Sequence, residues 1–300
     1  LTGGVDGWWN RLSSSVLYPG GCSVPSMESG RSSHVTFLTQ ESPPRITICG
    51  GWDGFDLAEK KDCLVLRNGG WRGGELDDLP DRRWRSASAR LDAGVFILGG
   101  GHYPPSSSLL LRADSNSWVE GPQLPVEMGS PCAAPISGHS FLIVYKRSVY
   151  EFDTREGGPT SSSGWKEEAT WPQLQVSRSW WPGCAVLGNR FIVAGGWNTD
   201  NDVLKSTEII DLEKRVIKFG GKMANPRVNF HLLSKRGNLF ALGGSNDRVV
   251  MITYYNLGVK YLAAVEEFVE KRGTWKKAKN LSGKRSGYGG LSVNIDIVCG

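Results

Sequence analysis

The sequence predicts an all-β fold built from one repeated unit, and the spacing of its glycine pairs and its composition lead to this prediction. Short apolar runs end in a glycine pair at Gly3-Gly4, Gly50-Gly51, Gly99-Gly100, Gly195-Gly196 and Gly243-Gly244. The first glycines are 47, 49, 96 and 48 residues apart, so one pair is missing from a regular series. A period of nearly fifty residues is typical of β-propellers. With 39 glycines, 15 prolines and 12 tryptophans, the chain suits short strands and tight turns better than helices.

Each repeat is expected to form one sheet, or blade, of four antiparallel strands, named a to d from the axis outward. The glycine pair ends strand b, because glycine lets the backbone turn out of a strand through conformations that other residues avoid. One blade cannot bury both of its apolar faces, whereas blades stacked around an axis can. We therefore expect a single domain, residues 1–300, folded as a six-bladed propeller.

The six blades can be placed along the chain. Blade one is incomplete, because residues 1–27 supply strands b, c and d but no strand a. The other blades are expected at residues 31–79, 83–125, 128–174, 178–223 and 227–281. Their b strands are expected at 46–49, 95–98, 141–144, 191–194 and 239–242, and their c strands at 63–66, 109–112, 148–152, 207–211 and 265–269. Blade four lacks the glycine pair, and residues 249–255 are expected to extend the b–c hairpin of blade six.

The C-terminal run from Arg285 to Asn294 has the character of a new strand a, the strand that blade one lacks. Residues 286–296 are therefore expected to complete blade one and to close the ring.

The strand pattern, the glycine pair and the aromatic that follows it in Gly50-Gly51-Trp52 and Gly195-Gly196-Trp197 resemble the kelch-repeat family over essentially the whole chain. In that family, closure by a C-terminal innermost strand is common. The sequence departs from the family pattern in the missing glycines of blade four and in a weak strand c in blade two. Its cysteine positions are similar to those of secreted or ectodomain kelch-like proteins of invertebrates.

Six cysteines allow fifteen complete pairings, and the sequence alone does not choose among them. The blade order narrows the choice, because it brings together Cys49 with Cys63, Cys22 with Cys299, and Cys132 with Cys184. Three such disulfides favour an oxidising, extracellular compartment. The alternative is six small buried thiols in a cytoplasmic protein. The sequon at Asn280 is compatible with secretion and glycosylation.

One end of the propeller is the expected binding face, because the b–c and d–a connections emerge there together. The residues expected at this mouth are Trp8, Trp9, Arg31, Trp52, Arg83, Trp84, His102, Tyr103, Tyr145, Arg178, Trp180, Trp181, Trp197, Arg227, Asn246 and Arg285. Tryptophan and arginine dominate binding hot spots and grip acidic or planar ligands. In the alternative interpretation, the tryptophans pack between blades and the arginines bond to neighbouring backbone.

The function predicted from the sequence is binding without catalysis. The net charge of +5 is mild, and Lys and Arg look scattered apart from residues 271–284, so no nucleic-acid partner is expected. No apolar run is long enough for a membrane span. The four histidines lack a short ligand spacing, so no metal, cofactor or catalytic residue is expected. We expect a secreted module that binds a protein, a glycan or a small aromatic or apolar ligand. The alternatives are an intracellular kelch scaffold or substrate-recruiting adaptor and, third, a metal-dependent oxidase.

Overall fold

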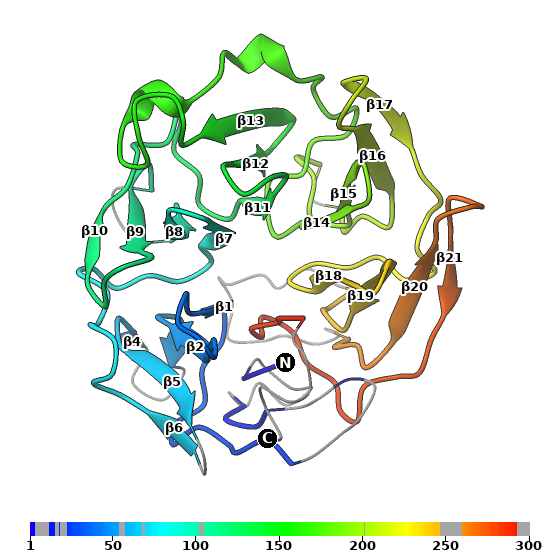
Figure 1. Cartoon of the computed structure of the whole chain (residues 1–300). Helices are drawn as coiled ribbons and strands as arrows, with labels where there is room; N and C mark the ends of the chain where they lie inside the picture. The colour runs from blue at the N-terminus through cyan, green and yellow to red at the C-terminus, as the bar shows by residue number, and fades with distance from the viewer. Residues whose placement is uncertain are drawn as a thin grey trace.

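The fold is an all-β propeller, as predicted, and five blades surround its central axis (Figure 1). The computed structural model describes residues 1–3, 12–15, 18, 23–53, 58–67, 70–101, 105–200, 202–246 and 260–292. Helical structure in this part of the chain is limited to two short 3-10 turns, η1 (Ser162–Gly164) and η2 (Glu168–Thr170). Neither of these turns has the length and apolar character needed to cross a bilayer.

The five blades follow the chain, and we number them two to six after the repeats that form them. Blade two holds β1 (Val35–Leu38), β2 (Ile46–Cys49), β5 (Cys63–Arg67) and β6 (Gly70–Arg72), and its b–c connection forms the hairpin β3 (Trp52–Asp53) and β4 (Ala58–Glu59). Blade three holds β7 (Ala87–Leu91), β8 (Gly94–Leu98), β9 (Ser108–Arg112) and β10 (Trp118–Glu120). Blade four holds β11 (Cys132–Pro135), β12 (Ser140–Tyr145) and β13 (Ser148–Asp153).

Blade five holds β14 (Gly183–Leu187), β15 (Arg190–Ala194), β16 (Thr207–Asp211) and β17 (Val216–Phe219). Blade six holds β18 (His231–Lys235), β19 (Asn238–Leu242), β20 (Val265–Val269) and β21 (Thr274–Lys277). In all five blades the b and c strands lie within one residue of their predicted bounds. Strand c of blade two, which looked weak, is a regular strand of five residues. Blade four has three strands, and Trp165 contributes only an isolated bridge to Phe152 where strand d was expected.

Packing between neighbouring blades explains why the apolar repeats assemble. The b strands are almost completely buried, and in β8 the side chains of Val95 to Leu98 have no exposed surface. Between blades three and four, the ring of Phe96 lies 5.6 Å from that of Phe141 and 5.8 Å from that of Phe152. Removing one such ring costs about 3–5 kcal/mol, so each interface between blades contributes strongly to stability.

The expected sixth sheet is not seen among the described residues. Residues 4–11, 16–17, 19–22 and 293–300, which belong to the expected blade one, lie outside the described part of the chain. The N-terminus and residues 285–292 lie in the sector between blade six and blade two (Figure 1). In this sector Thr2 forms isolated antiparallel bridges with Ser15 and with Gly289. The expected hairpin extension at residues 249–255 also lies outside the described residues.

Candidate functional site

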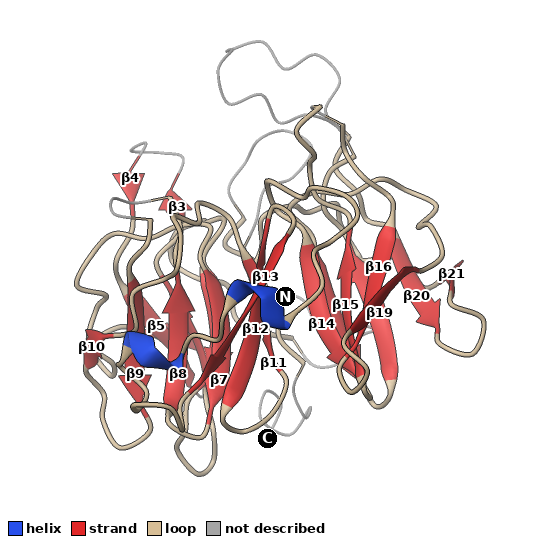
Figure 2. Ribbon diagram, turned by 90° about the horizontal axis from the view of Figure 1, so that it is seen from above, coloured by secondary structure: helices blue, strands red, loops and turns tan. Residues whose placement is uncertain are grey.

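The b–c and d–a connections emerge at the same end of the propeller, as the strand order requires. Figure 2 shows the β3–β4 hairpin projecting beyond the sheets at this end. The sequence-predicted binding residues in the described part of the chain belong to these connections. Ten of these twelve residues fall into two groups, a set of five buried arginines and a cluster of five tryptophans.

The five predicted arginines are buried instead of lining the mouth. They are exposed by 5% or less, and each donates a hydrogen bond from Nη1 to the carbonyl oxygen of the first glycine that ends strand b. The pairs are Arg31 with Gly50 (3.3 Å), Arg83 with Gly99 (3.2 Å), Arg178 with Gly195 (2.6 Å), Arg227 with Gly243 (2.6 Å) and Arg285 with Gly3 (3.1 Å). A guanidinium suits this position because its fork of donors reaches several acceptors at once.

Carboxylates compensate the buried charge in blades five and six. Arg178 lies 3.0 Å from Glu208, and Arg227 lies 2.7 Å from Glu266. Burial alone would raise the pKa of Glu266, but hydrogen bonds from Arg227 and from the backbone N–H of Ala224 hold this pKa below its usual value. These arginines therefore fasten the start of each blade to its own strands b and c. Their Nη donors bond inside the fold, whereas their Nε atoms have no hydrogen-bond partner among the described residues. Contact of these arginines with a ligand stays a prediction, which their burial does not favour.

The glycine pairs also join consecutive blades. The N–H of Gly196 donates to the carbonyl oxygen of Arg227 in the next blade (2.8 Å), and the N–H of Gly244 donates to that of Arg285 (2.9 Å). Gly195 has a φ of +60°, and a Cβ there would lie 2.5 Å from the Arg227 oxygen. Only glycine permits this close approach, so the repeated pair is a packing requirement of the propeller.

The tryptophans of the same connections gather into one cluster with Arg85. We call Trp52, Trp84, Arg85, Trp180, Trp181 and Trp197 the aromatic mouth. The guanidinium of Arg85 lies between two indoles, with its Cζ 3.7 Å from the ring centre of Trp84 and 4.4 Å from that of Trp181. Trp181 stacks on Trp197 at 6.2 Å with an interplanar angle of 11°. Trp52 extends the cluster beside Trp84 (5.8 Å), and Trp180 extends it beside Trp181 (5.8 Å).

Arg85 was not among the sequence-predicted residues. Its backbone belongs to a series of hydrogen bonds between blades in which every residue has an unusual conformation. Neighbouring blades are connected near the axis by backbone hydrogen bonds that run from Arg85 to Ser33, from Ser33 to Gly287, from Gly287 to Asn229 and from Asn229 to Trp181. These five residues all have a positive φ, between 51° and 62°. Left-handed backbone suits glycine and asparagine, whereas it costs other residues about 1–2 kcal/mol. Large side chains at two of these positions are therefore retained against a conformational cost.

The electrostatics of the aromatic mouth favour binding. Burial lowers the pKa of Arg85 to about 9, so the guanidinium stays charged at neutral pH although it is largely desolvated. The indole N–H groups of Trp84, Trp181 and Trp197 are buried and have no hydrogen-bond partner among the described residues. Buried donors are normally satisfied, so three unmatched donors in one cluster call for an acceptor.

Two further predicted mouth residues in the described part of the chain, Tyr145 and Asn246, make their printed contacts elsewhere. The ring of Tyr145 lies 5.3 Å from the ammonium nitrogen of Lys146 at the end of β12. Asn246 donates its backbone N–H to the carbonyl oxygen of Lys260 in blade six. The other four, Trp8, Trp9, His102 and Tyr103, lie outside the described residues.

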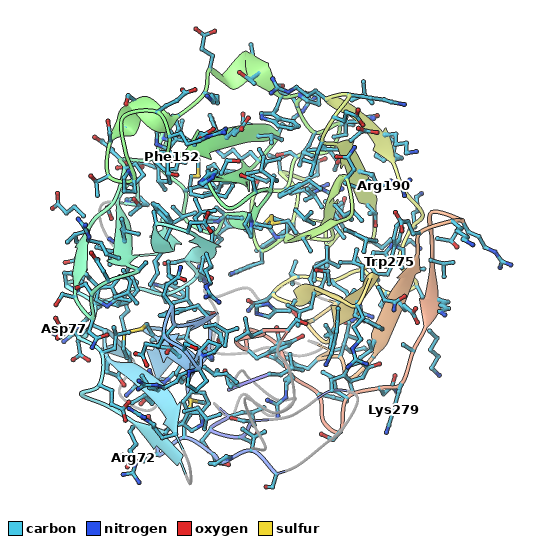
Figure 3. The ribbon with its side chains drawn as sticks, in the orientation of Figure 1. Arg72, Asp77, Phe152, Arg190, Trp275 and Lys279 are labelled. Carbon is cyan, nitrogen blue, oxygen red and sulfur yellow. A yellow bond between two sulfur atoms is a disulfide. The ribbon has the colours of Figure 1, made fainter. Side chains whose placement is uncertain are left out.

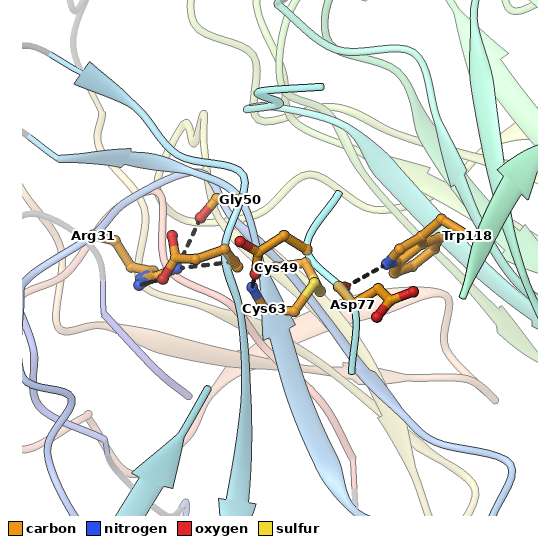
Figure 4. The surroundings of a disulfide bond; sticks show 8 residues. Arg31, Cys49, Gly50, Cys63, Asp77 and Trp118 are labelled. Carbon is orange, nitrogen blue, oxygen red and sulfur yellow. Dashed lines mark hydrogen bonds and ion pairs between the residues drawn. A yellow bond between two sulfur atoms is a disulfide. The ribbon is translucent and has the colours of Figure 1, made fainter. Parts of the chain in front are cut away.

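Two of the three expected disulfides are present. Cys49 and Cys63 lie opposite each other on strands b and c of blade two, with their Cα atoms 4.2 Å apart (Figure 4). Cys132 and Cys184 join the innermost strands of blades four and five across 5.8 Å. The expected partners Cys22 and Cys299 lie outside the described residues. Asn280, the predicted glycosylation site, is exposed.

The innermost strands enclose a cavity of about 520 Å³ along the axis. Small apolar residues such as Ala133 and Ala185 line it, together with His34, Arg90 and His231. The Nε2 atom of His34 hydrogen-bonds with Thr2 (2.9 Å), and that of His231 donates to the carbonyl oxygen of Tyr288 (2.5 Å). Among the residues that can be described, no three His, Cys, Asp or Glu side chains are grouped to hold a metal.

Comparison with known proteins adds no relative: no family model matches the chain, and no curated protein matches it. The resemblance to kelch repeats therefore depends on the repeat pattern of the sequence itself.

Proposed function

We propose that this protein is a non-enzymatic recognition module whose ligand binds at the aromatic mouth. The observation that carries the proposal is the stack of Trp84, Arg85 and Trp181, in which two large side chains occupy left-handed backbone positions. Strained positions cluster at functional sites because the surrounding fold must hold them in place. A β-propeller commonly serves as a binding or scaffold module, in agreement with this assignment.

The chemistry of the mouth defines what it binds. Indole rings offer large, flat, apolar surfaces whose faces carry partial negative charge. The guanidinium adds a positive charge, and the three unmatched indole N–H groups add hydrogen-bond donors. A protein loop, a glycan or a small aromatic ligand that carries oxygen acceptors meets these demands. A cationic ligand is disfavoured, because Arg85 already occupies the space between the indoles.

Recognition at such a mouth needs a rigid ring, and we propose that the propeller closes as a six-bladed, kelch-type ring through its two chain ends. Arg285 donates to the carbonyl oxygens of Gly3 and Ser14 and to the hydroxyl of Ser14. Arg83 makes the same three kinds of bond in blade three, to Gly99 and to Ser107. The repeated pattern supports a blade one assembled from residues of both ends.

The proposed setting is extracellular. The disulfides Cys49–Cys63 and Cys132–Cys184 are compatible with an oxidising compartment and favour a secreted module over an intracellular scaffold or adaptor. Non-reducing mass spectrometry of protein from the native source tests this setting. Free thiols at Cys49 and Cys63 would instead support the intracellular alternative.

The experiment that tests the binding function identifies a ligand and then maps it. Glycan, peptide and aromatic small-molecule libraries are screened with the purified chain, and the best ligand is titrated by calorimetry against Trp180→Ala and Trp84→Phe. We expect about a tenfold or greater loss of affinity for Trp180→Ala, as is typical of a hot-spot tryptophan. Trp118→Phe on the outer strand of blade three is the matched control. Equal affinities of all three variants and the unaltered protein would refute binding at the aromatic mouth.

A further inference from the structure

The positive charge of this protein is concentrated in two segments, residues 213–222 and 270–284. We call their ten exposed bases the basic rim: Lys214, Arg215, Lys218, Lys222, Lys271, Arg272, Lys276, Lys277, Lys279 and Lys284. Only Glu213 and Glu270 oppose them within these segments, which gives a net charge of +8. The whole chain carries +5, so all remaining residues together carry −3.

The fold brings the two segments together although they are distant in the sequence. They contain β17 and β21, the outer strands of the adjacent blades five and six (Figure 1). The N–H of Gly221 donates to the carbonyl oxygen of Gly273 at 2.6 Å, and the indole of Trp275 donates to the hydroxyl of Thr207 at 3.0 Å. Figure 3 shows Lys279 at the outer edge of blade six. One continuous basic surface therefore covers the perimeter of two blades.

Most of this charge is not neutralised within the described part of the chain. Lys276 pairs with Glu267 at 3.1 Å, and it alone of the ten bases has an ion pair with a described carboxylate. Glu270 is itself engaged by Arg190 of blade five at 3.2 Å. Like charges gathered on one surface repel each other and destabilise the compact state, unless an external anion compensates them.

Protection of a sheet edge does not account for the basic rim. Lysines on outer strands prevent edge-to-edge aggregation, so a few are expected in any blade. However, the corresponding outer segments of blades two and three, residues 67–82 and 112–127, carry net charges of −1 and −2. Edge protection would apply equally to all blades, whereas the excess of positive charge lies in blades five and six.

We propose that the basic rim binds a sulfated polysaccharide. Eight of its ten bases are lysines, and their compact ammonium charges on flexible stems suit a flexible polyanion. The strand β17 also carries Val216 (54% exposed) and Phe219 (53% exposed), which offer apolar contact beside the charges. The choice of a sulfated polysaccharide over a nucleic acid rests on the proposed secretion, because sulfated glycans are the extended polyanions outside cells. The site is separate from the aromatic mouth.

The test uses a heparin-derived octasaccharide as the probe, with its desulfated counterpart and a single-stranded DNA of equal charge. The variant Lys218→Gln/Lys271→Gln/Lys277→Gln/Lys279→Gln removes four charges from the rim. The control Lys61→Gln/Arg72→Gln/Arg82→Gln/Arg112→Gln removes four exposed charges from blades two and three. At about 0.15 M salt, we expect the rim variant to bind at least tenfold more weakly and the control to change less than threefold. The reason is that salt screens distant charges, so that the bases next to the sulfate groups contribute most of the binding.

Each outcome decides the proposal. Equal losses in the two variants would indicate a response to net charge alone and would overturn a localised site. Equal binding of the sulfated and desulfated octasaccharides, or tighter binding of DNA, would overturn the sulfated polysaccharide as the partner. All substituted side chains are exposed, so both variants are expected to keep the melting temperature of the unaltered protein. Trp180→Ala should bind the octasaccharide normally, and this result separates the basic rim from the aromatic mouth.

Discussion

The guanidinium of Arg285 donates a hydrogen bond of 3.1 Å to the carbonyl oxygen of Gly3, although 282 residues separate them along the chain. Arg83 makes the equivalent bond to Gly99 within blade three, across 16 residues. The same local geometry therefore recurs between residues at the two ends of the chain and within a single repeat. Mutation of Arg285 can therefore test whether the two ends of the chain close the ring.

Arg285→Ala is expected to lower the free energy of unfolding by about 2–4 kcal/mol, because it removes the guanidinium donor from the buried carbonyl oxygen of Gly3 and two further hydrogen bonds to Ser14. Arg83→Ala is the matched variant, since it removes the same three bonds from blade three. Urea denaturation followed by tryptophan fluorescence measures both values. If Arg285→Ala lowers the free energy of unfolding far less than Arg83→Ala does, the contacts between the two ends stabilise the protein less than those within blade three.

Loss of the disulfide between Cys132 and Cys184 should destabilise the protein more than loss of that between Cys49 and Cys63. The first closes a segment of 52 residues and joins two blades, whereas the second closes 14 residues within one blade. The chain-entropy model gives roughly 4 and 3 kcal/mol for these loops. Melting temperatures of the two double Cys→Ala variants test the order. The reverse order would indicate that native-state effects outweigh loop entropy.

Stability is expected to fall on mild acidification because of two desolvated histidines, His34 and His231. Burial lowers the pKa of His231 to about 4 and lowers the pKa of His34 well below its usual value, and Arg31 adds to the second effect. The unfolded chain takes up protons on these groups near pH 6.5, whereas the folded protein does so only at lower pH. Their effect is therefore absent above pH 6.5 and grows as the pH falls toward 4, reaching about 3 kcal/mol for His231.

Urea denaturation at pH 7 and at pH 5 measures this loss. His231→Gln should make the stability less dependent on pH over this interval. An unaltered pH dependence in His231→Gln would show that this histidine is not the group responsible.

Gly101→Ala should weaken ligand binding at the aromatic mouth without altering any of its residues. A Cβ on Gly101 would lie 2.3 Å from Nε1 of Trp84, so the indole has to shift from its present position. We expect a loss of affinity of about tenfold, measured by calorimetry with the ligand found by screening. Gly283→Ala is the control, because a Cβ there has open space around it. Unchanged affinity in Gly101→Ala would mean that the position of Trp84 is not critical.

Much of the fold was predictable from the sequence. The glycine pairs located four of the five b strands, since only glycine allows the sharp exit seen at Gly195, and the strand order paired Cys49 with Cys63. The candidate site was predicted less well. The tryptophans do gather at one end, but the arginines are buried and bond to neighbouring backbone, as in the alternative interpretation of the sequence. The pattern of an arginine followed by a glycine pair in the same repeat is the signal that indicates this role.

By itself, the sequence determined where strands begin and end and which face of each is apolar, because backbone freedom and burial depend on local residue type. Only the tertiary structure decided which distant residues meet. It placed Arg85 between Trp84 and Trp181, and it brought the segment after β17 next to the turn before β21, so that two modest runs of lysine became one basic rim. The physical reason is that contact between residues of different blades depends on how the repeats stack around the axis. The conformational preferences of single residues do not determine the distance between such residues.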